Sequence, residues 1–330
     1  MEAIKQPVSR IVWIDWMKTI GIYLIVLGHF FSVGEKYVYV FNGPLFFVLS
    51  GFLSKKETDN KLFWKKLWYN FVVPMLLICL LNFLINVGET YAHGGAVSVK
   101  SVGYFWFQAL IGLQSSLGTC WFIYSLVIIK IIYQYTPKGA WSLLLVVLFA
   151  ACAYGYNQLD LNTLHPILRK ANAAVAVFVT YPCFIVGSYL RSYKDQLNKY
   201  QNVWGLGTLL VVSLLVVFLC GIYNGDVRIY ICGFGGNFLL YLIGFVAGTA
   251  FIYSICKFLS DYHTRWMSLA AKGTILIMGF HPWFIPLCRL FFPTPSLLDY
   301  VLSVLIVAFF LPITVLADKY FPLILGKLRK

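Results

Sequence analysis

Long, continuously apolar runs follow one another along the chain and are separated by short polar segments. A transmembrane helix needs roughly 20 apolar residues, whereas the strands of a membrane barrel would alternate apolar and polar positions. The pattern therefore predicts an all-α fold, a polytopic transmembrane helical bundle that takes up residues 1–330 as a single domain. About ten spans are expected, at residues 11–33, 38–54, 67–87, 119–136, 139–156, 172–190, 203–222, 229–256, 269–291 and 298–318.

One apolar stretch, residues 102–117, fits this scheme poorly. It is short for a span and contains the polar or small residues Gly103, Gln108 and Gly112, so we expect a re-entrant or interfacial segment. If it crossed the membrane, the C-terminus would change side.

Composition and charge agree with a membrane protein. Hydrophobic residues make up 60% of the chain and charged residues only 12%, whereas soluble proteins carry roughly 25% charged residues. The net charge is +14, and with the N-terminus inside most basic residues fall in the inner segments. This bias predicts that both termini are cytoplasmic, and it explains the charge without a nucleic-acid partner. The eight cysteines are scattered singly and no histidine pair has metal-ligand spacing, so no disulfide framework or metal is expected.

The first helix contains ionisable residues that are costly in lipid and usually face a cavity or a partner. Asp15 and Lys18 are three residues apart and can pair on one face. His29 follows Lys18 by eleven residues, which is about three turns, so both project from the same face about 16 Å apart. The spacing is compatible with a functional polar stripe that ends at His29. It is equally compatible with an interfacial ion pair and a structural histidine.

Two later helices are interrupted by proline. Asn42, Gly43 and Pro44 stand at the start of the second span, with Ser50 further along it, and His281 precedes Pro282 in the ninth. Proline frees a backbone carbonyl, and such a break persists in a membrane where it lines a cavity. A kinked packing helix is the alternative interpretation of the first of these breaks.

A basic loop at residues 55–66 contains five lysines beside aromatic residues. Phosphate groups are attracted to such a surface, and indoles can stack on a base. A positive-inside loop beside an aromatic belt explains the same pattern. Within this loop the candidates for binding an anionic substrate are Lys61, Lys65 and Lys66.

Together these residues resemble the acyltransferase-3 family of polytopic membrane acyltransferases that modify bacterial surface glycans. The most specific match is a basic residue and a histidine eleven positions later, here Lys18 and His29. Weaker matches are the sequences at 14–18, 44–52, 121–122, 273–281 and 320–327. The chain departs from the family in two places. Asn42 stands where many members have a histidine, and Leu67 and Asn70 stand where many have paired arginines.

The resemblance implies transfer of an acyl group, usually acetyl, from cytosolic acyl-coenzyme A to a hydroxyl of a surface or lipid-linked glycan. It implies a multi-pass protein of the bacterial cytoplasmic membrane, with acetyl-CoA as co-substrate and no bound cofactor. His29 would act as a general base or carry the acyl group, with Lys18 and Asp15 organising the stripe. Further residues expected at the acceptor site are Asn42, Ser50, Trp121 and His281. The sequence does not indicate an oligomeric state.

A transporter or flippase of a lipid-linked glycan is the alternative function. Such a protein would also have polar intramembrane residues and broken helices. Transporters commonly place similarly interrupted helices in corresponding positions of two halves, and the sequence has no such pair. A non-catalytic membrane scaffold would need no histidine aligned with a lysine across a span.

Overall fold

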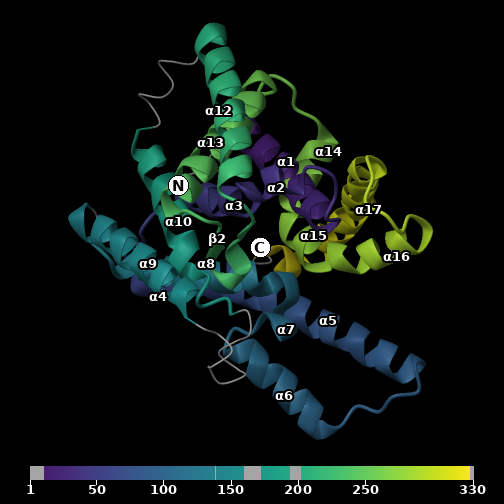
Figure 1. Cartoon of the computed structure of the whole chain (residues 1–330). Helices are drawn as coiled ribbons and strands as arrows, with labels where there is room; N and C mark the ends of the chain where they lie inside the picture. The colour runs from purple at the N-terminus through teal and green to yellow at the C-terminus, as the bar shows by residue number, and fades with distance from the viewer. Residues whose placement is uncertain (1–10, 138, 160–171, 194–201, 328–330) are drawn as a thin grey trace, which may run out of the picture.

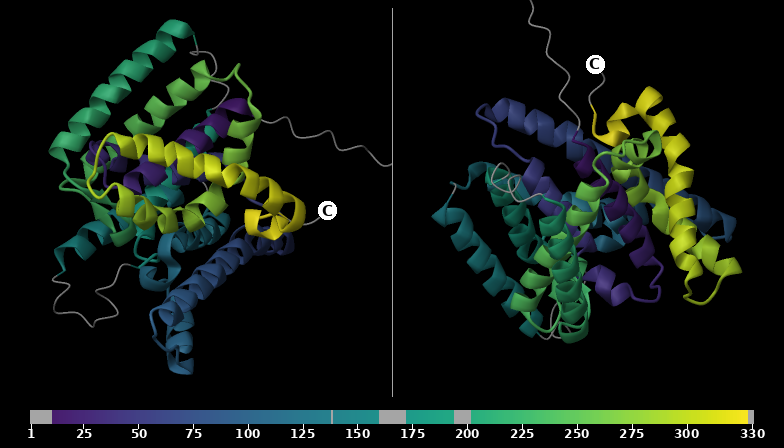
Figure 2. Two further views of the ribbon diagram at one scale, coloured as in Figure 1. Left: turned by 90° about the vertical axis from the view of Figure 1, so that its right-hand side faces the viewer. Right: turned by 90° about the horizontal axis from the view of Figure 1, so that it is seen from above.

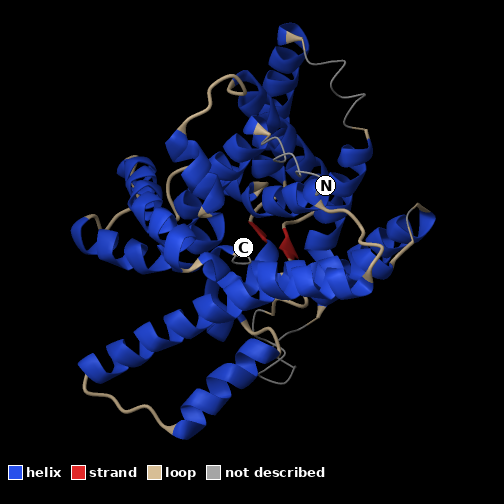
Figure 3. Cartoon of the chain, turned by 180° about the vertical axis from the view of Figure 1, so that it is seen from behind, coloured by secondary structure: helices blue, strands red, loops and turns tan. Residues whose placement is uncertain are grey.

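The computed structural model describes residues 11–137, 139–159, 172–193 and 202–327. Helices dominate this part of the chain, and the strands in it are the short pair β1 (Val227–Arg228) and β2 (Gly233–Phe234) (Figure 3). The all-α prediction is therefore confirmed. Both chain ends lie outside the described residues, so their cytoplasmic location stays a prediction.

Helix α1 (Val12–His29) lies inside the bundle and contacts several other helices. Its apolar side chains Ile22 and Val26 are fully buried. The partners of α1 include α2 (Glu35–Tyr39), α3 (Asn42–Leu53), α13 (Phe238–Phe258), α14 (Arg265–Lys272), α15 (Thr274–Phe280) and α17 (Leu298–Tyr320). Figure 2 shows α17, in yellow, lying along one side of this group. Helix α1 is thus surrounded by protein rather than by lipid over much of its length.

Helices α3 and α10 (Val177–Ser192) pack with their backbones in contact. A Cβ atom added to Gly51 would lie 1.9 Å from the carbonyl oxygen of Phe184, and one added to Gly187 would lie 1.9 Å from that of Val48. Small residues allow this close approach between helices in membranes.

The remaining long helices surround this centre. Helices α12 (Val203–Tyr223) and α13 pair side by side, and α9 (Ala140–Gln158) packs against α10 (Figure 1). Helix α8 (Trp121–Tyr135) contacts α10 from another side. Helix α4 (Asn60–Leu67) continues through the π-helix η1 (Trp68–Val72) into α5 (Val73–Ala92).

Helices α5 and α6 (Val99–Leu110) form a hairpin that projects away from the bundle (Figure 1). Helix α6 has 12 residues, about 18 Å of rise, which is too short for a hydrocarbon core of about 30 Å. The chain turns at Gly112, with a φ of 82°, and enters α7 (Gln114–Leu117) and the 3-10 turn η2 (Gly118–Cys120). The stretch 102–117 is therefore not a single span.

Eight helical stretches of the described residues are long and apolar enough to cross a membrane. They match eight of the ten expected spans, and the other two expected spans correspond to α1 and α10. The eight stretches are Glu35–Leu53, Asn60–Ala92, Gln114–Tyr135, Ala140–Gln158, Val203–Tyr223, Phe238–Phe258, Thr274–Phe291 and Leu298–Tyr320.

Three expected spans have different internal structures. The span expected at 229–256 begins later, at Phe238, because the 3-10 turn η4 (Ile229–Ile231) and the strands β1 and β2 form a hairpin before it. The side chain of Asn237 then accepts hydrogen bonds from the first backbone N–H groups of α13, which fixes its start.

The other two are broken as their prolines predict. Residues 38–54 divide into α2 (Glu35–Tyr39) and α3, and the break falls just before Asn42. Residues 269–291 divide into α14, α15, the 3-10 turn η5 (His281–Trp283) and α16 (Phe284–Phe291). A last 3-10 turn, η6 (Pro322–Leu325), follows α17.

Candidate active site

Two histidines from distant parts of the sequence meet inside the bundle. His29 is the last residue of α1, and His281 is the first residue of η5, where the helix containing α15 is interrupted by Pro282. Their ring centroids are 4.7 Å apart and the rings are nearly perpendicular, at 77°. The edge of one imidazole therefore meets the face of the other.

Backbone contacts define the tautomer of both rings. Nδ1 of His29 lies 2.8 Å from the carbonyl oxygen of Ile25, and Nδ1 of His281 lies 2.9 Å from that of Ile277. A carbonyl oxygen can only accept, so each Nδ1 carries the proton and each Nε2 is left with a lone pair. Nε2 of His281 is buried and has no hydrogen-bond partner within the described part of the chain. The pair thus presents two basic nitrogens, which is the state that a general base requires.

Asn42 lies beside the turn that contains His29. Its side-chain Nδ2 donates to the carbonyl oxygen of Leu24 at 3.5 Å, and a Cβ atom added to Gly28 would lie 2.9 Å from the same nitrogen. Tyr39 donates to the carbonyl oxygen of Gly28 at 2.9 Å. Glycine at position 28 therefore allows α3 and α2 to place polar groups against the end of α1.

Side chains from two other segments hold the helix that leads to His281. Thr119 Oγ1 donates to the carbonyl oxygen of Met278 at 2.6 Å. Asn82 Nδ2 donates to the carbonyl oxygen of Gly279 at 3.3 Å, and Asn82 Oδ1 accepts from Trp283 Nε1 at 2.8 Å. These bonds satisfy carbonyl groups that the proline-containing break leaves without helical partners.

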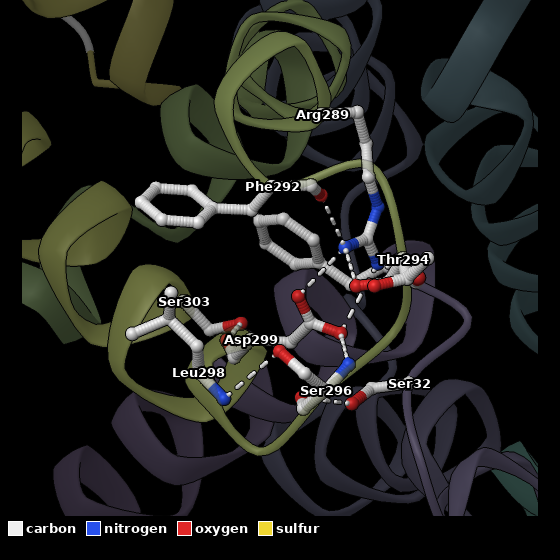
Figure 4. Close-up of polar contacts among 9 residues, drawn as sticks. Ser32, Arg289, Phe292, Thr294, Ser296, Leu298, Asp299 and Ser303 are labelled. Atoms are coloured by element: carbon white, nitrogen blue, oxygen red, sulfur yellow. Dashed lines mark hydrogen bonds and ion pairs between the residues drawn. The ribbon is translucent and has the colours of Figure 1, made fainter.

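A buried ion pair ties together the segments that follow the two histidines (Figure 4). Arg289 of α16 binds Asp299 of α17 at 2.9 and 3.1 Å and also donates to the carbonyl oxygen of Phe30, the residue after His29. Asp299 is completely buried and accepts a third hydrogen bond, from the backbone N–H of Ser296. Ser32 donates to the carbonyl oxygen of Ser296 at 3.1 Å. The end of α1 is thereby fixed relative to the segment that follows His281.

A cavity of about 560 Å³ opens at the other end of α1. Its inner wall is apolar and includes Phe46, Phe122 and Met278. The same cavity is lined by six lysines from five parts of the chain, Lys18, Lys55, Lys66, Lys130, Lys272 and Lys327. Among the residues described, the acidic one that lines it is Glu57. Such a cavity favours an anionic ligand with an apolar portion.

Lys66, Lys272 and Lys327 are held by carboxylates. Lys66 binds Glu57 at 2.7 Å, and Asp318 binds both Lys272, at 2.6 Å, and Lys327, at 2.7 Å. Burial lowers the pKa of Lys327, the bond to Asp318 opposes this, and the neighbouring Lys272 lowers it further. These pairs place basic side chains in fixed positions around the mouth of the cavity.

The histidine pair and the cavity lie at different heights along the same two segments of the bundle. Lys18 lines the cavity, and His29 lies eleven residues further along the same helix, about 16 Å along its axis. On α15, Met278 lines the cavity and His281 follows three residues later. Neither histidine lines the cavity itself.

The other expected site residues are distributed over both parts or lie outside them. Ser50 lines the cavity, whereas Asp15 is buried in the first turn of α1 outside its lining. Trp121 packs against Phe47 and Tyr230 and does not line the cavity. Of the three candidate lysines in the basic loop, only Lys66 lines the cavity, and Lys61 and Lys65 are exposed. The roles given to these residues stay predictions.

Three lysines that line the cavity are not among the site residues expected from the sequence. Lys130, Lys272 and Lys327 come from α8, the end of α14 and the segment after η6. Lys130 had a recognisable signal, because it is the only charged residue in the apolar run 121–135. No group of three or more potential metal ligands occurs in the part of the chain that the structure describes.

The helices and this two-part site define a polytopic membrane protein with a histidine pair inside the bundle and a basic cavity at one end. The chain belongs to the acyltransferase-3 family, because the family model described as an acyltransferase domain matches residues 11–317. It is similar to the nodulation protein NolL of Mesorhizobium japonicum, with 24% identity over 230 residues. The match covers 62% of this chain and 54% of that protein, so the chain spans about half the length of this relative. No solved structure matches the chain significantly.

Proposed function

We propose that this membrane acyltransferase transfers an acyl group, acetyl by its family resemblance, from acyl-coenzyme A to a hydroxyl of a surface or lipid-linked glycan. The bacterial cytoplasmic membrane is its proposed location, with the lysine-lined cavity on the cytoplasmic side. The main support for the proposal is that two basic histidine nitrogens and a lysine-lined cavity lie along the same helix, α1.

The cavity supports coenzyme A as the donor carrier. Coenzyme A combines several phosphates with an apolar arm that ends in the thiol. The lysines attract the phosphates, and the apolar inner wall suits the arm and the acyl group. That wall ends at Met278, one turn before His281, so the thioester end of the donor points toward the histidines.

Direct transfer needs one base. Nε2 of His29 accepts the proton of the acceptor hydroxyl while the hydroxyl oxygen forms a bond to the thioester carbonyl carbon. The carbon–sulfur bond then breaks, and the coenzyme A thiolate takes the proton from the imidazolium. The products are the ester and the free thiol, and His29 is again neutral.

In the second route the acyl group passes through the histidine itself, and the products are the same. Nε2 of His29 attacks the thioester carbonyl carbon, and the carbon–sulfur bond breaks to give the coenzyme A thiolate and an acyl-imidazolium whose Nδ1 keeps its proton. The acceptor hydroxyl oxygen then bonds to the acyl carbon, the carbon–nitrogen bond breaks, and the hydroxyl proton passes to the thiolate, which gives the ester and the free thiol. In both routes the Nδ1 bond to Ile25 keeps Nε2 unprotonated and oriented. His281 supplies a second acceptor at the same place, where it can orient the acceptor hydroxyl.

Mass spectrometry of surface glycans from cells with and without the protein tests the proposal. A mass difference of one acyl group, lost when His29 is replaced by glutamine, is the expected result. Transport of an unmodified glycan that depends on the protein, with no acyl difference, would support the flippase instead. Transfer of labelled acetyl groups from acetyl-CoA to glycan in isolated membranes tests the donor separately.

A further inference from the structure

Lys130 differs from the other lysines of the cavity in its surroundings. It lies in the middle of the apolar helix α8, and its side chain lines the cavity. Its ammonium group donates to Ser54 Oγ at 2.7 Å and lies over the rings of Phe71, at 4.9 Å, and Phe184, at 5.7 Å. The wall behind the ammonium group is therefore one hydroxyl and two aromatic faces.

No carboxylate among the residues described by the structure forms an ion pair with Lys130. In contrast, Lys66 is paired with Glu57, and Lys272 with Asp318. A charged lysine within a membrane bundle is costly, and such residues usually pair with another charge or mark a ligand path. Neither a serine hydroxyl nor an aromatic ring neutralises the charge of Lys130. An anionic ligand in the cavity would do so.

The position of Lys130 along α8 is also suitable for binding an anionic ligand. Phe122, at the apolar inner wall, lies eight residues before Lys130 on the same helix, about 12 Å along the axis. A donor whose acyl end reaches Phe122 would therefore place a more distant part of its carrier beside Lys130. In acyl-coenzyme A that part is the phosphate-bearing end.

Two cavity residues near Lys130 are uncharged, so they cannot bind an anionic ligand by charge. Leu67 and Asn70 both line the cavity. Neither residue carries a charge, and Asn70 lies in the π-helix η1, beside Phe71. Basic groups must then come from other elements, and Lys130 extends into the same region through its contact with Phe71.

We propose that Lys130 binds a phosphate group of the acyl donor, an inference that rests on the proposed function. An ammonium group acts on phosphate as a point charge. The proposal does not need a particular phosphate of coenzyme A, because the diphosphate and the ribose phosphate present the same chemistry. The test must therefore compare a donor that has phosphates with one that has none.

Transfer kinetics with acetyl-CoA and with acetyl-pantetheine, which lacks all phosphates, make this comparison. Lys130→Met keeps the aliphatic stem and removes the charge. A hydrogen bond to a charged group contributes roughly 1.5–3 kcal/mol, so KM for acetyl-CoA should rise about 10- to 100-fold. KM for acetyl-pantetheine should stay within about twofold, and Lys130→Arg should restore part of the affinity for acetyl-CoA. A parallel rise of KM for both donors, or no rise for either, would overturn the proposal.

Lys56→Met is the matched control. Lys56 lies over the ring of Tyr133 at 5.3 Å and donates to the carbonyl oxygen of Thr136, but it does not line the cavity. Its replacement should leave both KM values unchanged. Binding of coenzyme A to the purified protein in detergent adds a readout that does not need turnover. Weaker binding by Lys130→Met in a protein that transfers no acyl group would support the inference and refute the proposed function, whereas equal binding would refute the inference.

Discussion

Replacing His29 by glutamine separates the two roles that its ring can have. Glutamine retains hydrogen-bonding groups but cannot take up a proton near neutral pH. If Nε2 of His29 is the base, His29→Gln should be as inactive as His29→Ala. If the ring only supports the end of α1 through Ile25, glutamine should preserve most of the activity.

The two roles differ strongly in expected magnitude. Loss of a general base typically lowers the rate by a factor of about 10² to 10⁴, which corresponds to about 2.7–5.5 kcal/mol of activation free energy. Loss of the hydrogen bond to the carbonyl of Ile25 should lower the free energy of unfolding by about 1 kcal/mol. A protein that is stable by about 5 kcal/mol or more would still be more than about 99% folded. Misfolding therefore cannot account for a hundredfold loss.

The assay is transfer of labelled acetyl groups from acetyl-CoA in membranes that contain equal amounts of each variant. His263→Ala is the matched control, because His263 contacts Ser268 at 3.0 Å outside the cavity lining and away from the histidine pair. It should retain full activity. A partial loss is expected for His281→Ala, and equal, complete losses at His29 and His281 would indicate that the two share the acid and base roles. Substantial activity in His29→Gln would refute the assignment of His29 as the base.

Three further changes test the fold and the two parts of the site. Gly187→Ala should lower the free energy of unfolding by about 3 kcal/mol or more, because its Cβ would lie 1.9 Å from a carbonyl oxygen of Val48; an unchanged melting temperature would contradict the close helix packing. Asp299→Asn should lower the free energy of unfolding by about 3 kcal/mol and also reduce kcat, because the ion pair with Arg289 fixes the end of α1. A normal kcat in the folded variant would show that this ion pair does not position His29. Lys66→Gln should raise KM for acetyl-CoA and Lys65→Gln should not, because only Lys66 lines the cavity; equal effects would indicate a general surface charge effect.

Much of the local structure followed from sequence spacing. The helix at the start of the chain and the breaks near Pro44 and Pro282 are all present. These features depend on local rules, namely the length of apolar runs and the missing donor of proline. The late start of α13 was not predicted, because the apolar residues 229–232 look like the beginning of the span. The chain turns at Cys232, whose φ is 63°, and the glycines and Asn237 that follow were the signal that the span begins later.

The composition of the site was harder to predict. His29 and His281 were both candidates, yet only the packing of α15 against α1 brings their rings together. No periodicity in one sequence specifies which helices become neighbours in a bundle. The same holds for Lys130, which was not among the expected site residues, because the sequence could not show that Ser54 and Phe71 would surround it beside a cavity.

The separation between the cavity and the histidines has a chemical consequence. Phe46, Phe122 and Met278 form the inner wall of the cavity, and Phe46 and Phe122 contact each other with ring centroids 6.0 Å apart. Because neither histidine lines the cavity, a thioester bound in it has to move beyond the cavity lining to reach Nε2 of either histidine. Methionine is the most adaptable of the three side chains, because it is unbranched and has three rotatable bonds. A wall that opens by movement of Met278 would admit a small acyl group while limiting the entry of water, which would otherwise compete with the acceptor hydroxyl for the thioester.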